Sequence, residues 1–397
     1  MCPAPAKVLD DLRLLGAFGT NKVMAGELSR LTRRAFDDVR LPEPKKADVG
    51  AIVYPFDPRV ARLATLYHRT SARVLWDVLE TSAPRLSPLF EDVVNLATAR
   101  VARWLWNGAG ISVYAQGVQE FAAGERQVVG TVKNALIEAA SRQGIEVRLN
   151  AEAPDVVFSV RGDEGVLRVS LDLAGRPMNQ RGYRRERGPA PLREDLAAVL
   201  LMLARYDPRK DVLIDPMAGS GTIAIEAACM AKALPVFLPE RRPALERIPA
   251  FRELAAAAGD PPLFADANPI VLASDIDAQL SAVTRLAAEA AGVSASVRVV
   301  TSDFRDLSKR TLREVSGADM LEHGLILSNP PYGERMQPAE LRELYADLGR
   351  FCASFQGFRA AFLVANADFE AAFGGRPRIK KPMSIGPLRG FFYLYEL

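Results

Sequence analysis

The sequence predicts an α/β protein whose C-terminal half contains a doubly wound, mostly parallel sheet. From residue 189 onward, short apolar segments alternate with helical segments, as strands joined by crossover helices do. The preceding region, roughly 90–180, has a different rhythm that indicates a smaller α+β module. A chain of 397 residues is also too long for one ordinary hydrophobic core, so we expect two or three domains.

Composition narrows the class of protein. With 49% hydrophobic and 25% charged residues, the chain is neither disordered nor fibrous. Its net charge is only +3, so any nucleic-acid surface must come from local clusters of Arg and Lys. No apolar run approaches the length of about 18 residues that a membrane span requires, and the first residues do not resemble a signal peptide.

Cysteine and histidine usage points to a reducing compartment and away from metal chemistry. Cys2, Cys229 and Cys352 are odd in number and far apart, which fits a cytoplasmic protein without a disulfide framework. His68 and His323 are the only histidines, so we expect neither a histidine-based metal site nor a histidine-based catalytic triad.

In the N-terminal half, the first 66 residues carry few clear signals. Residues 59–80 suit a helix or a strand followed by a helix, and 89–106 have helical apolar spacing. The next segments predict a strand at 111–117, a helix at 131–144 that ends at Gly144, and three strands within 145–173.

A cluster of arginines follows at 174–188. The cluster contains one acid, Glu186, and Tyr183, Asn179 and Gln180 stand among its basic residues, which are Arg176, Arg181, Arg184, Arg185 and Arg187. The segment is either a solvated linker or a surface that binds phosphates. We favour the phosphate-binding surface, because the cluster departs sharply from a near-neutral chain.

The C-terminal half shows regular alternation, interrupted once. Helices are expected at 191–206, 222–233 and 278–292, and strands at 211–215, 270–275, 296–303, 324–330, 359–366 and 391–397. The interruption at 232–269 is interpreted as a surface elaboration near the functional site.

Ligands of open parallel sheets bind outside the carboxyl ends of the strands, and four strand ends here carry polar signals. The first is DPMAGSGT, where Gly219 and Gly221 allow a tight turn and close approach of a ligand before a helix begins. No lysine follows, so this segment is not a P-loop, and its spacing is not GxGxxG.

The second and third signals are acids. Asp275 is placed to accept the ribose hydroxyls of a nucleoside, whereas Asp277 either assists or caps the following helix. Asp303 could accept a purine amino group, with Phe304 as a ring neighbour, although an aspartate after a strand is also ordinary turn chemistry.

The fourth signal is SNPPYGER at 328–335. The side-chain oxygen of Asn329 and the carbonyl of Pro330 are two acceptors held still by the prolines, and Tyr332 offers a ring face. Two acceptors on one NH2 group would free its delocalised lone pair for attack, without a basic side chain. Together the four signals favour a nucleoside-dependent group transfer over a non-catalytic α/β domain.

These residues resemble a known family. DPMAGSGT, SDID, SDF and NPPY are similar to the motifs of class I S-adenosylmethionine-dependent methyltransferases that modify amino nitrogens. The junction at 171–198 and NPPYGER resemble the THUMP-domain RNA guanine-N2 methyltransferases, which act on 23S rRNA or tRNA. Departures are Asn179, where the family commonly has histidine, the unclear first 66 residues and the closing segment 384–397.

The resemblance implies roles for individual residues. Asn329, Pro330, Pro331 and Tyr332 would bind the target amino group and base, and RNA would be contacted by Arg176, Arg181, Tyr183, Arg184 and Arg185. No metal is expected. The cofactor S-adenosylmethionine would be bound by Asp215, Pro216, Ala218, Gly219, Gly221, Thr222, Asp275, Ile276, Asp303, Phe304, Asn329, Pro191 and Leu192.

The resemblance also implies an organisation and an activity. We expect a divergent ferredoxin-like or helical region at 1–90, a THUMP-like RNA-binding domain at 91–182 and a Rossmann-like methyltransferase domain with a mostly parallel seven-stranded sheet at 183–397. The expected enzyme is a cytoplasmic monomer that methylates guanosine N2 in structured RNA, most directly 23S rRNA. The alternatives are a tRNA guanine-N2 enzyme, an enzyme acting on DNA adenine or protein glutamine, and a non-catalytic RNA-binding or ribosome-assembly protein.

Overall fold

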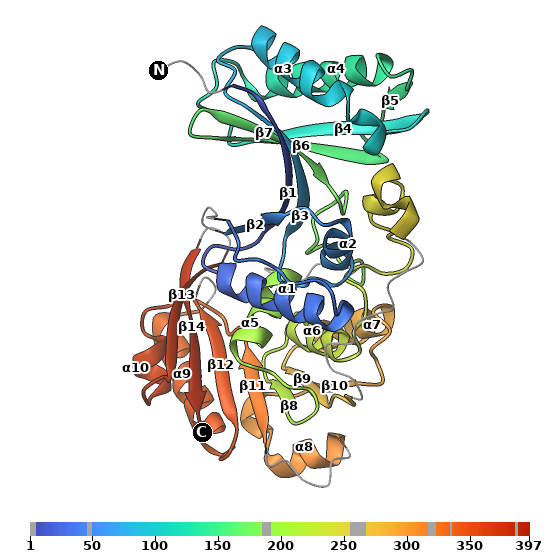
Figure 1. The fold of residues 1–397 in the computed structure, drawn as a ribbon. Coiled ribbons are helices and arrows are strands. Elements are labelled where there is room, and N and C mark those ends of the chain that lie inside the picture. The colour runs from blue at the N-terminus through green and yellow to red at the C-terminus, as the bar shows by residue number, and fades with distance from the viewer. Residues whose placement is uncertain are drawn as a thin grey trace. The chain divides into compact units, whose positions relative to one another are not determined.

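A computed structural model describes residues 5–45, 50–184, 192–254, 267–316, 323–333, 336–385 and 388–397. The chain divides into two compact units (Figure 1). The N-terminal unit comprises Met1–Leu15, Leu31–Met178 and Pro239–Gly259. The C-terminal unit comprises Gly16–Arg30, Asn179–Leu238 and Asp260–Leu397. The domain boundaries expected from the sequence are not decided by this division and stay a prediction.

The N-terminal unit is built on one seven-stranded sheet of order β2-β1-β3-β7-β6-β4-β5. Only β4 pairs in parallel, with β5 and β6, and the other pairs are antiparallel. The helices α3 and α4 pack against each other and cover one face of this sheet (Figure 1). The elements are β1 Lys7–Leu15, β2 Ala51–Pro55, α2 Pro58–Tyr67, β3 Arg73–Thr81, α3 Leu86–Thr98, β4 Ala109–Gln116, α4 Glu125–Ser141, β5 Val147–Leu149, β6 Val156–Asp163 and β7 Val166–Asp172.

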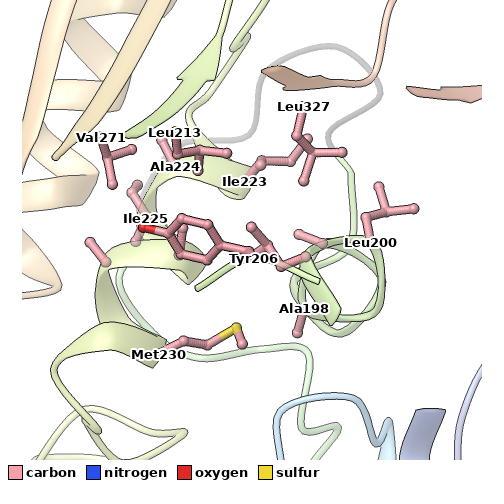
Figure 2. Close-up of a cluster of buried hydrophobic side chains, with 14 of the residues drawn as sticks. Ala198, Leu200, Tyr206, Leu213, Ile223, Ala224, Ile225, Met230, Val271 and Leu327 are labelled. Atoms are coloured by element: carbon pink, nitrogen blue, oxygen red, sulfur yellow. The ribbon is translucent and has the colours of Figure 1, made fainter. Parts of the chain in front are cut away.

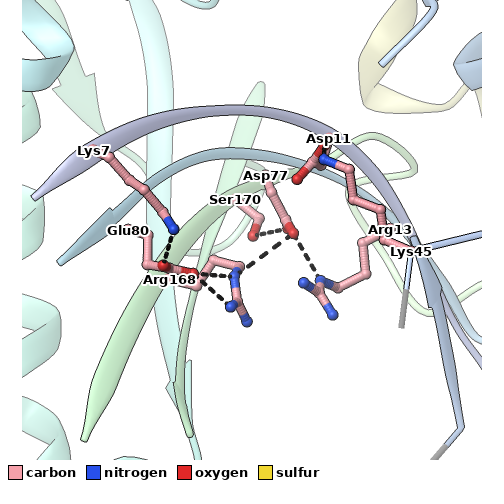
Figure 3. Close-up of polar contacts among 8 residues, drawn as sticks. All are labelled: Lys7, Asp11, Arg13, Lys45, Asp77, Glu80, Arg168 and Ser170. Atoms are coloured by element: carbon pink, nitrogen blue, oxygen red, sulfur yellow. Dashed lines mark hydrogen bonds and ion pairs between the residues drawn. The ribbon is translucent and has the colours of Figure 1, made fainter. Parts of the chain in front are cut away.

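A charged network crosses three strands of this sheet (Figure 3). Asp77 on β3 is fully buried and accepts hydrogen bonds from Arg13 Nε on β1 at 2.7 Å and from Ser170 Oγ on β7 at 2.6 Å. Nearby, Glu80 pairs with Lys7 and Arg168. A buried carboxylate is tolerated only when it is paired and hydrogen-bonded, so these partners hold the three strands in register.

The interpretation of 232–269 as a surface elaboration near the site is wrong for its central part, which belongs to the core of the N-terminal unit. The backbone N–H of Leu245 donates to the carbonyl of Leu173 at 2.8 Å, and Phe251 is buried edge-on against Trp76. Apolar residues spaced through a polar segment therefore fill a core formed by distant parts of the chain.

The C-terminal unit contains a seven-stranded sheet of order β10-β9-β8-β11-β12-β14-β13. Strands β10 to β12 are parallel, and β14 is antiparallel to both β12 and β13. The elements are α5 Glu194–Leu203, β8 Val212–Asp215, α6 Thr222–Ala231, β9 Val271–Asp275, α7 Ala278–Ala290, β10 Val297–Thr301, α8 Lys309–Ser316, β11 Gly324–Ser328, α9 Pro338–Ala353, β12 Arg359–Val364, α10 Phe369–Phe373, β13 Ile379–Ile385 and β14 Leu388–Glu396.

Alternate residues of these strands enter two separate cores, because side chains alternate between the faces of a sheet. Leu213 and Leu327 face α5, α6 and α7, whereas Ile214 and Ile326 face α8, α9 and α10. Figure 2 shows the first core, in which Tyr206, Ile223 and other apolar side chains pack together. Because both faces are covered, the strands are continuous apolar runs, as their sequences indicated.

The α/β fold and the mostly parallel seven-stranded sheet are thus confirmed. The sequence did not indicate the strands β1, β2 or β13. The helix α1 (Asn21–Ala35) begins in the C-terminal unit, although it comes before most of the N-terminal unit in the sequence. None of the helices in the described ranges is long and apolar enough to cross a membrane.

Candidate active site

The strand order reverses between β8 and β11, and a crevice opens at the carboxyl ends of strands at such a switch point. A cavity of about 500 Å³ lies there, within the C-terminal unit. Its described lining is Leu192, Asp215, Pro216, Met217, Ala218, Gly219, Ser220, Thr222, Ile223, Asp275, Ile276, Leu280, Asp303, Phe304, Arg305, Asn329, Pro330, Pro331, Tyr332, Gly333, Met336 and Leu344. All four polar strand ends expected from the sequence contribute to this one cavity.

The glycine-rich turn after β8 is held by the neighbouring strand. Gly219 N–H donates to the Asp275 carboxylate at 2.8 Å, and its carbonyl accepts from Thr284 Oγ1 at 2.9 Å. Both glycines have positive φ, and a Cβ on Gly221 would lie 2.4 Å from Thr284 Cγ2. Gly221 is not among the described residues that line the cavity; it is the residue from which α6 begins.

Asp215 ends β8 and is 1% exposed. Its Oδ1 accepts from Ser328 Oγ at 2.6 Å and from Met217 N–H at 3.4 Å. Burial, with a smaller contribution from the Asp275 charge, raises the pKa of Asp215 to about 7 against these hydrogen bonds. The cavity therefore presents a carboxyl group whose ionisation a neighbouring cation would favour.

Two further acids lie on the cavity wall. Asp275 uses Oδ2 for Gly219 N–H and Oδ1 for Asp277 N–H at 3.0 Å, and each oxygen keeps a second lone pair. The Asp277 carboxylate accepts a hydrogen bond from Gln279 N–H and caps α7, which is one of the two roles that the sequence left open for this residue. The Asp303 carboxylate accepts a hydrogen bond from the Arg305 backbone N–H at 2.9 Å and another from the Arg305 guanidinium at 2.8 Å.

The NPPY segment leaves β11 and turns along the cavity wall. Asn329, Pro330, Pro331 and Tyr332 all line the cavity. The Tyr332 hydroxyl donates to Asn329 Oδ1, and burial raises the pKa of this phenol, so it stays protonated. The Asn329 oxygen and the Tyr332 hydroxyl therefore lie next to each other on the cavity wall.

The described members of the arginine cluster do not form one exposed surface. Arg181 and Tyr183 are 1% and 2% exposed, and both contact the buried Glu226 of α6. Their predicted contact with RNA is wrong for this conformation, because a buried acid neutralises Arg181 inside the unit. Arg184 Nη2 donates to the Leu192 carbonyl at 3.1 Å and to Thr222 Oγ1 at 2.5 Å, so it braces two residues of the cavity wall.

Some predicted residues lie outside the described ranges. Pro191 and Arg185 are among them, as are Glu334 and Arg335 of the NPPYGER stretch. Among the described residues, no group of three or more His, Cys, Asp or Glu side chains could hold a metal ion.

Sequence reasoning missed several residues at the site. Ser328 stands directly before NPPY, and its place in the sequence predicts no role, although its hydroxyl donates a hydrogen bond to Asp215. Met336 and Leu344 line the cavity from the segment that leads into α9 and from α9 itself, and no local motif marks them. Only a helix packed against the NPPY turn brings them there.

The seven-stranded sheet with one antiparallel strand, its glycine-rich turn and the acids after the next two strands define a class I methyltransferase fold. A family model described as the RMKL-like methyltransferase domain matches residues 181–390. The chain belongs to this family.

Known proteins similar to the whole chain carry related names. The chain is 28% identical over 382 residues to the ribosomal RNA large subunit methyltransferase K/L of Magnetococcus marinus, covering 90% of this chain and 49% of that protein. It is 26% identical over 367 residues to the putative RNA methyltransferase YpsC of Bacillus subtilis, covering 88% and 89%. The chain thus spans about half the length of the K/L relative and most of YpsC.

The fold of the whole chain is also found among solved structures. The putative methyltransferase SMU.472, solved in complex with SAH, is similar with a TM-score of 0.80 at 24% identity, covering 98% of both chains. At this identity, the likeness concerns the fold.

Proposed function

We propose that this protein transfers a methyl group from S-adenosylmethionine to the exocyclic N2 amino group of a guanosine in RNA, and that 23S rRNA is its substrate. The observation that carries the proposal is the placement of Asn329 and Pro330 in the same cavity as the glycine-rich turn and Asp275. Family membership and the name of the K/L relative support the choice of RNA.

The cavity suits this cofactor. When bound, S-adenosylmethionine supplies a methyl group on a positively charged sulfur that is already activated for transfer. Asp275 has lone pairs for the ribose hydroxyls, and the free N–H groups at the start of α6 suit a carboxylate. Ile276 is 72% exposed on the cavity wall, which suits the flat face of the adenine ring, and Asp215 suits a cationic amino group.

The NPPY residues would act on the target base. The Asn329 oxygen and the Pro330 carbonyl would accept hydrogen bonds from the two N–H groups of the target amino group. These hydrogen bonds would draw the nitrogen lone pair out of conjugation with the ring. An amide oxygen has two lone pairs, so Asn329 can accept this hydrogen bond while it holds the Tyr332 hydroxyl. The base must leave its stack to reach the cavity, where the Tyr332 ring would support it. Positioning, not a basic side chain, then supplies the catalysis.

We propose that the N-terminal unit, with the predicted ferredoxin-like region at 1–90 and THUMP-like region at 91–182, holds the RNA, and that 183–397 performs the transfer. Arg176 remains a candidate RNA contact. Burial and the nearby charges of Arg241 and Arg247 lower its pKa. Within the described ranges, neither Arg176 nor Arg241 has an ion-pair partner, so an RNA phosphate would relieve their repulsion.

The test is transfer of labelled methyl to RNA from a strain that lacks this protein. We expect wild-type protein to label 23S rRNA and Asn329→Ala to label it at least about a hundredfold more slowly, because one of the two acceptors is lost. Mass-spectrometric mapping should find N2-methylguanosine. Full activity of Asn329→Ala would contradict the assigned role.

Other substrates would appear as distinct results of the same experiment. Labelled tRNA, labelled adenine, or labelling that survives RNase would each replace the proposed substrate. A non-catalytic protein should show no heat when titrated with S-adenosylhomocysteine. We propose that the protein acts in the cytoplasm, as a monomer; light scattering of the purified protein tests the oligomeric state.

A further inference from the structure

Two side chains outside the motif hold the NPPY turn by its backbone. The Tyr345 hydroxyl donates to the Pro331 carbonyl at 2.7 Å. Asn366 Nδ2 donates to the Tyr332 carbonyl at 3.2 Å. The described part of the chain makes no hydrogen bond to the Pro330 carbonyl, and Pro330 is one of the residues that line the cavity. Two carbonyls of the turn, those of Pro331 and Tyr332, are therefore hydrogen-bonded to the protein, and the Pro330 carbonyl is left to bind a ligand.

Tyr345 is itself immobilised. It lies on α9, is 0% exposed, and packs edge-on against Phe369 with ring centroids 5.0 Å apart. Burial raises the pKa of its phenol, with smaller contributions from Tyr332 and Asp368, so the hydroxyl keeps the proton that it donates. A hydroxyl on a fixed ring is a rigid hydrogen-bond donor.

The orientation of Asn366, just after β12, is set by its other end. Its Oδ1 accepts from Asp368 N–H at 2.9 Å, so its Nδ2 faces the Tyr332 carbonyl. The Asp368 carboxylate pairs with Arg342 of α9 at 2.8 Å. The donor to Tyr332 is thus connected to the same helix that carries Tyr345.

Close packing against α9 adds to this hold. Gly333 has φ of +104°, and a Cβ at this position would lie 2.8 Å from Leu341 Cδ2. The positive φ favours glycine at this position, and the Leu341 side chain of α9 packs directly against the turn.

The torsions show why two hydrogen bonds suffice. The pyrrolidine rings fix φ of Pro330 and Pro331 near −65°. Tyr345 restrains ψ of Pro331 through its carbonyl, and Asn366 restrains the next peptide plane. The direction of the Pro330 carbonyl then has little remaining freedom.

We infer that Tyr345 and Asn366 are positioning residues for methyl transfer, which hold the turn so that the Pro330 carbonyl and the Asn329 amide oxygen converge on the target amino group. The inference rests on the proposed function. It extends the site beyond the motif, to one residue of α9 and one that follows β12. A displacement of about 1 Å at a reacting group can cost a hundredfold in rate, so these contacts matter for kcat.

The test compares Tyr345→Phe and Asn366→Asp with Tyr395→Phe. Tyr395 lies in the same hydrophobic core, and its buried hydroxyl has no hydrogen-bond partner among the described residues, so this variant removes an equivalent atom without a contact. Asn366→Asp keeps the shape of the side chain and removes its donor. Each variant is measured for kcat, KM for RNA, affinity for S-adenosylhomocysteine, and amide exchange of residues 328–333 by mass spectrometry.

We expect kcat to fall about tenfold in Tyr345→Phe and Asn366→Asp, with KM and S-adenosylhomocysteine affinity within about twofold of wild type. Amide exchange at 328–333 should quicken in both variants, and Tyr395→Phe should match wild type. If Tyr345→Phe equals Tyr395→Phe in either kcat or exchange, the inference is wrong. A wild-type protein that methylates no RNA would overturn the proposed function, and the exchange measurement would then decide alone whether these residues hold the turn.

Discussion

Asp215 offers the sharpest test of the electrostatics of the cavity. Its carboxyl group is buried and its pKa is raised to about 7 from an ordinary value of 3.8. The unfolded chain loses this proton near pH 4, whereas the folded protein keeps it to about pH 7. Across this window the folded state binds more protons, so the contribution of Asp215 to stability is lost as the pH rises.

The magnitude follows from the size of the shift. A difference of about three pH units corresponds to about 4 kcal/mol of unfolding free energy once the group is fully ionised. About 2.5 kcal/mol of this develops between pH 5 and pH 8. Asp215→Asn keeps an acceptor for Ser328 and removes the charge, so without a cofactor it should be more stable than wild type, by a margin that grows with pH.

Calorimetric melting at pH 5 and pH 8 measures this margin. The transition that shifts with S-adenosylhomocysteine reports the C-terminal unit, in which we expect the advantage of Asp215→Asn to grow by roughly 5–10 °C between the two pH values. Asp207→Asn is the control, because Arg209 lowers the pKa of that carboxyl and its titration lies below this range. A pH-independent difference between Asp215→Asn and wild type would refute the reasoning.

Three further predictions concern residues around the site and the N-terminal core. Arg184→Ala should weaken S-adenosylhomocysteine binding about tenfold in calorimetric titration and leave RNA affinity unchanged, because the Arg184 side chain holds Leu192 and Thr222 in the cavity wall. A loss of RNA affinity alone would instead show that Arg184 contacts RNA. Gly221→Ala should lose more stability than Gly219→Ala in thermal melts, since both have positive φ but only Gly221 would drive a Cβ into Thr284; equal losses would contradict this. Asp77→Ala should destabilise the N-terminal unit by about 3–5 kcal/mol in urea unfolding, because it removes the buried carboxylate that binds both Arg13 and Ser170 and links three strands; a loss below about 1 kcal/mol would contradict this.

The residues that line the cavity were predictable because most of them belong to four short segments of the sequence. Each polar signal follows directly on an apolar strand, and parallel strands bring their carboxyl ends to one edge. Asp215, Gly219, Asp275 and Asn329 therefore meet in the fold as their positions in the sequence indicated. Backbone geometry carries this information from sequence to site without any long-range packing.

The arginine cluster shows where local reading fails. A run of arginines has the same appearance whether its members face water or a buried acid. Glu226 lies more than forty residues further along the chain, inside an apolar helix, and only the packing of α6 against residues 181–183 makes it the partner of Arg181 and Tyr183. The strand β13 was missed for a related reason, since its pairing with β14 and not its own composition defines it.

The sequence by itself determined the class of the fold and the strand ends that line the cavity, because period, turns and strand ends are local properties. Tertiary structure decided which arginines are buried and which helix supports the NPPY turn. Tyr345 and Asn366 belong to no motif, and they contact the turn only because α9 and the end of β12 pack beside it. Hydrogen bonds between segments far apart in the chain depend on that packing, which no short stretch of sequence encodes.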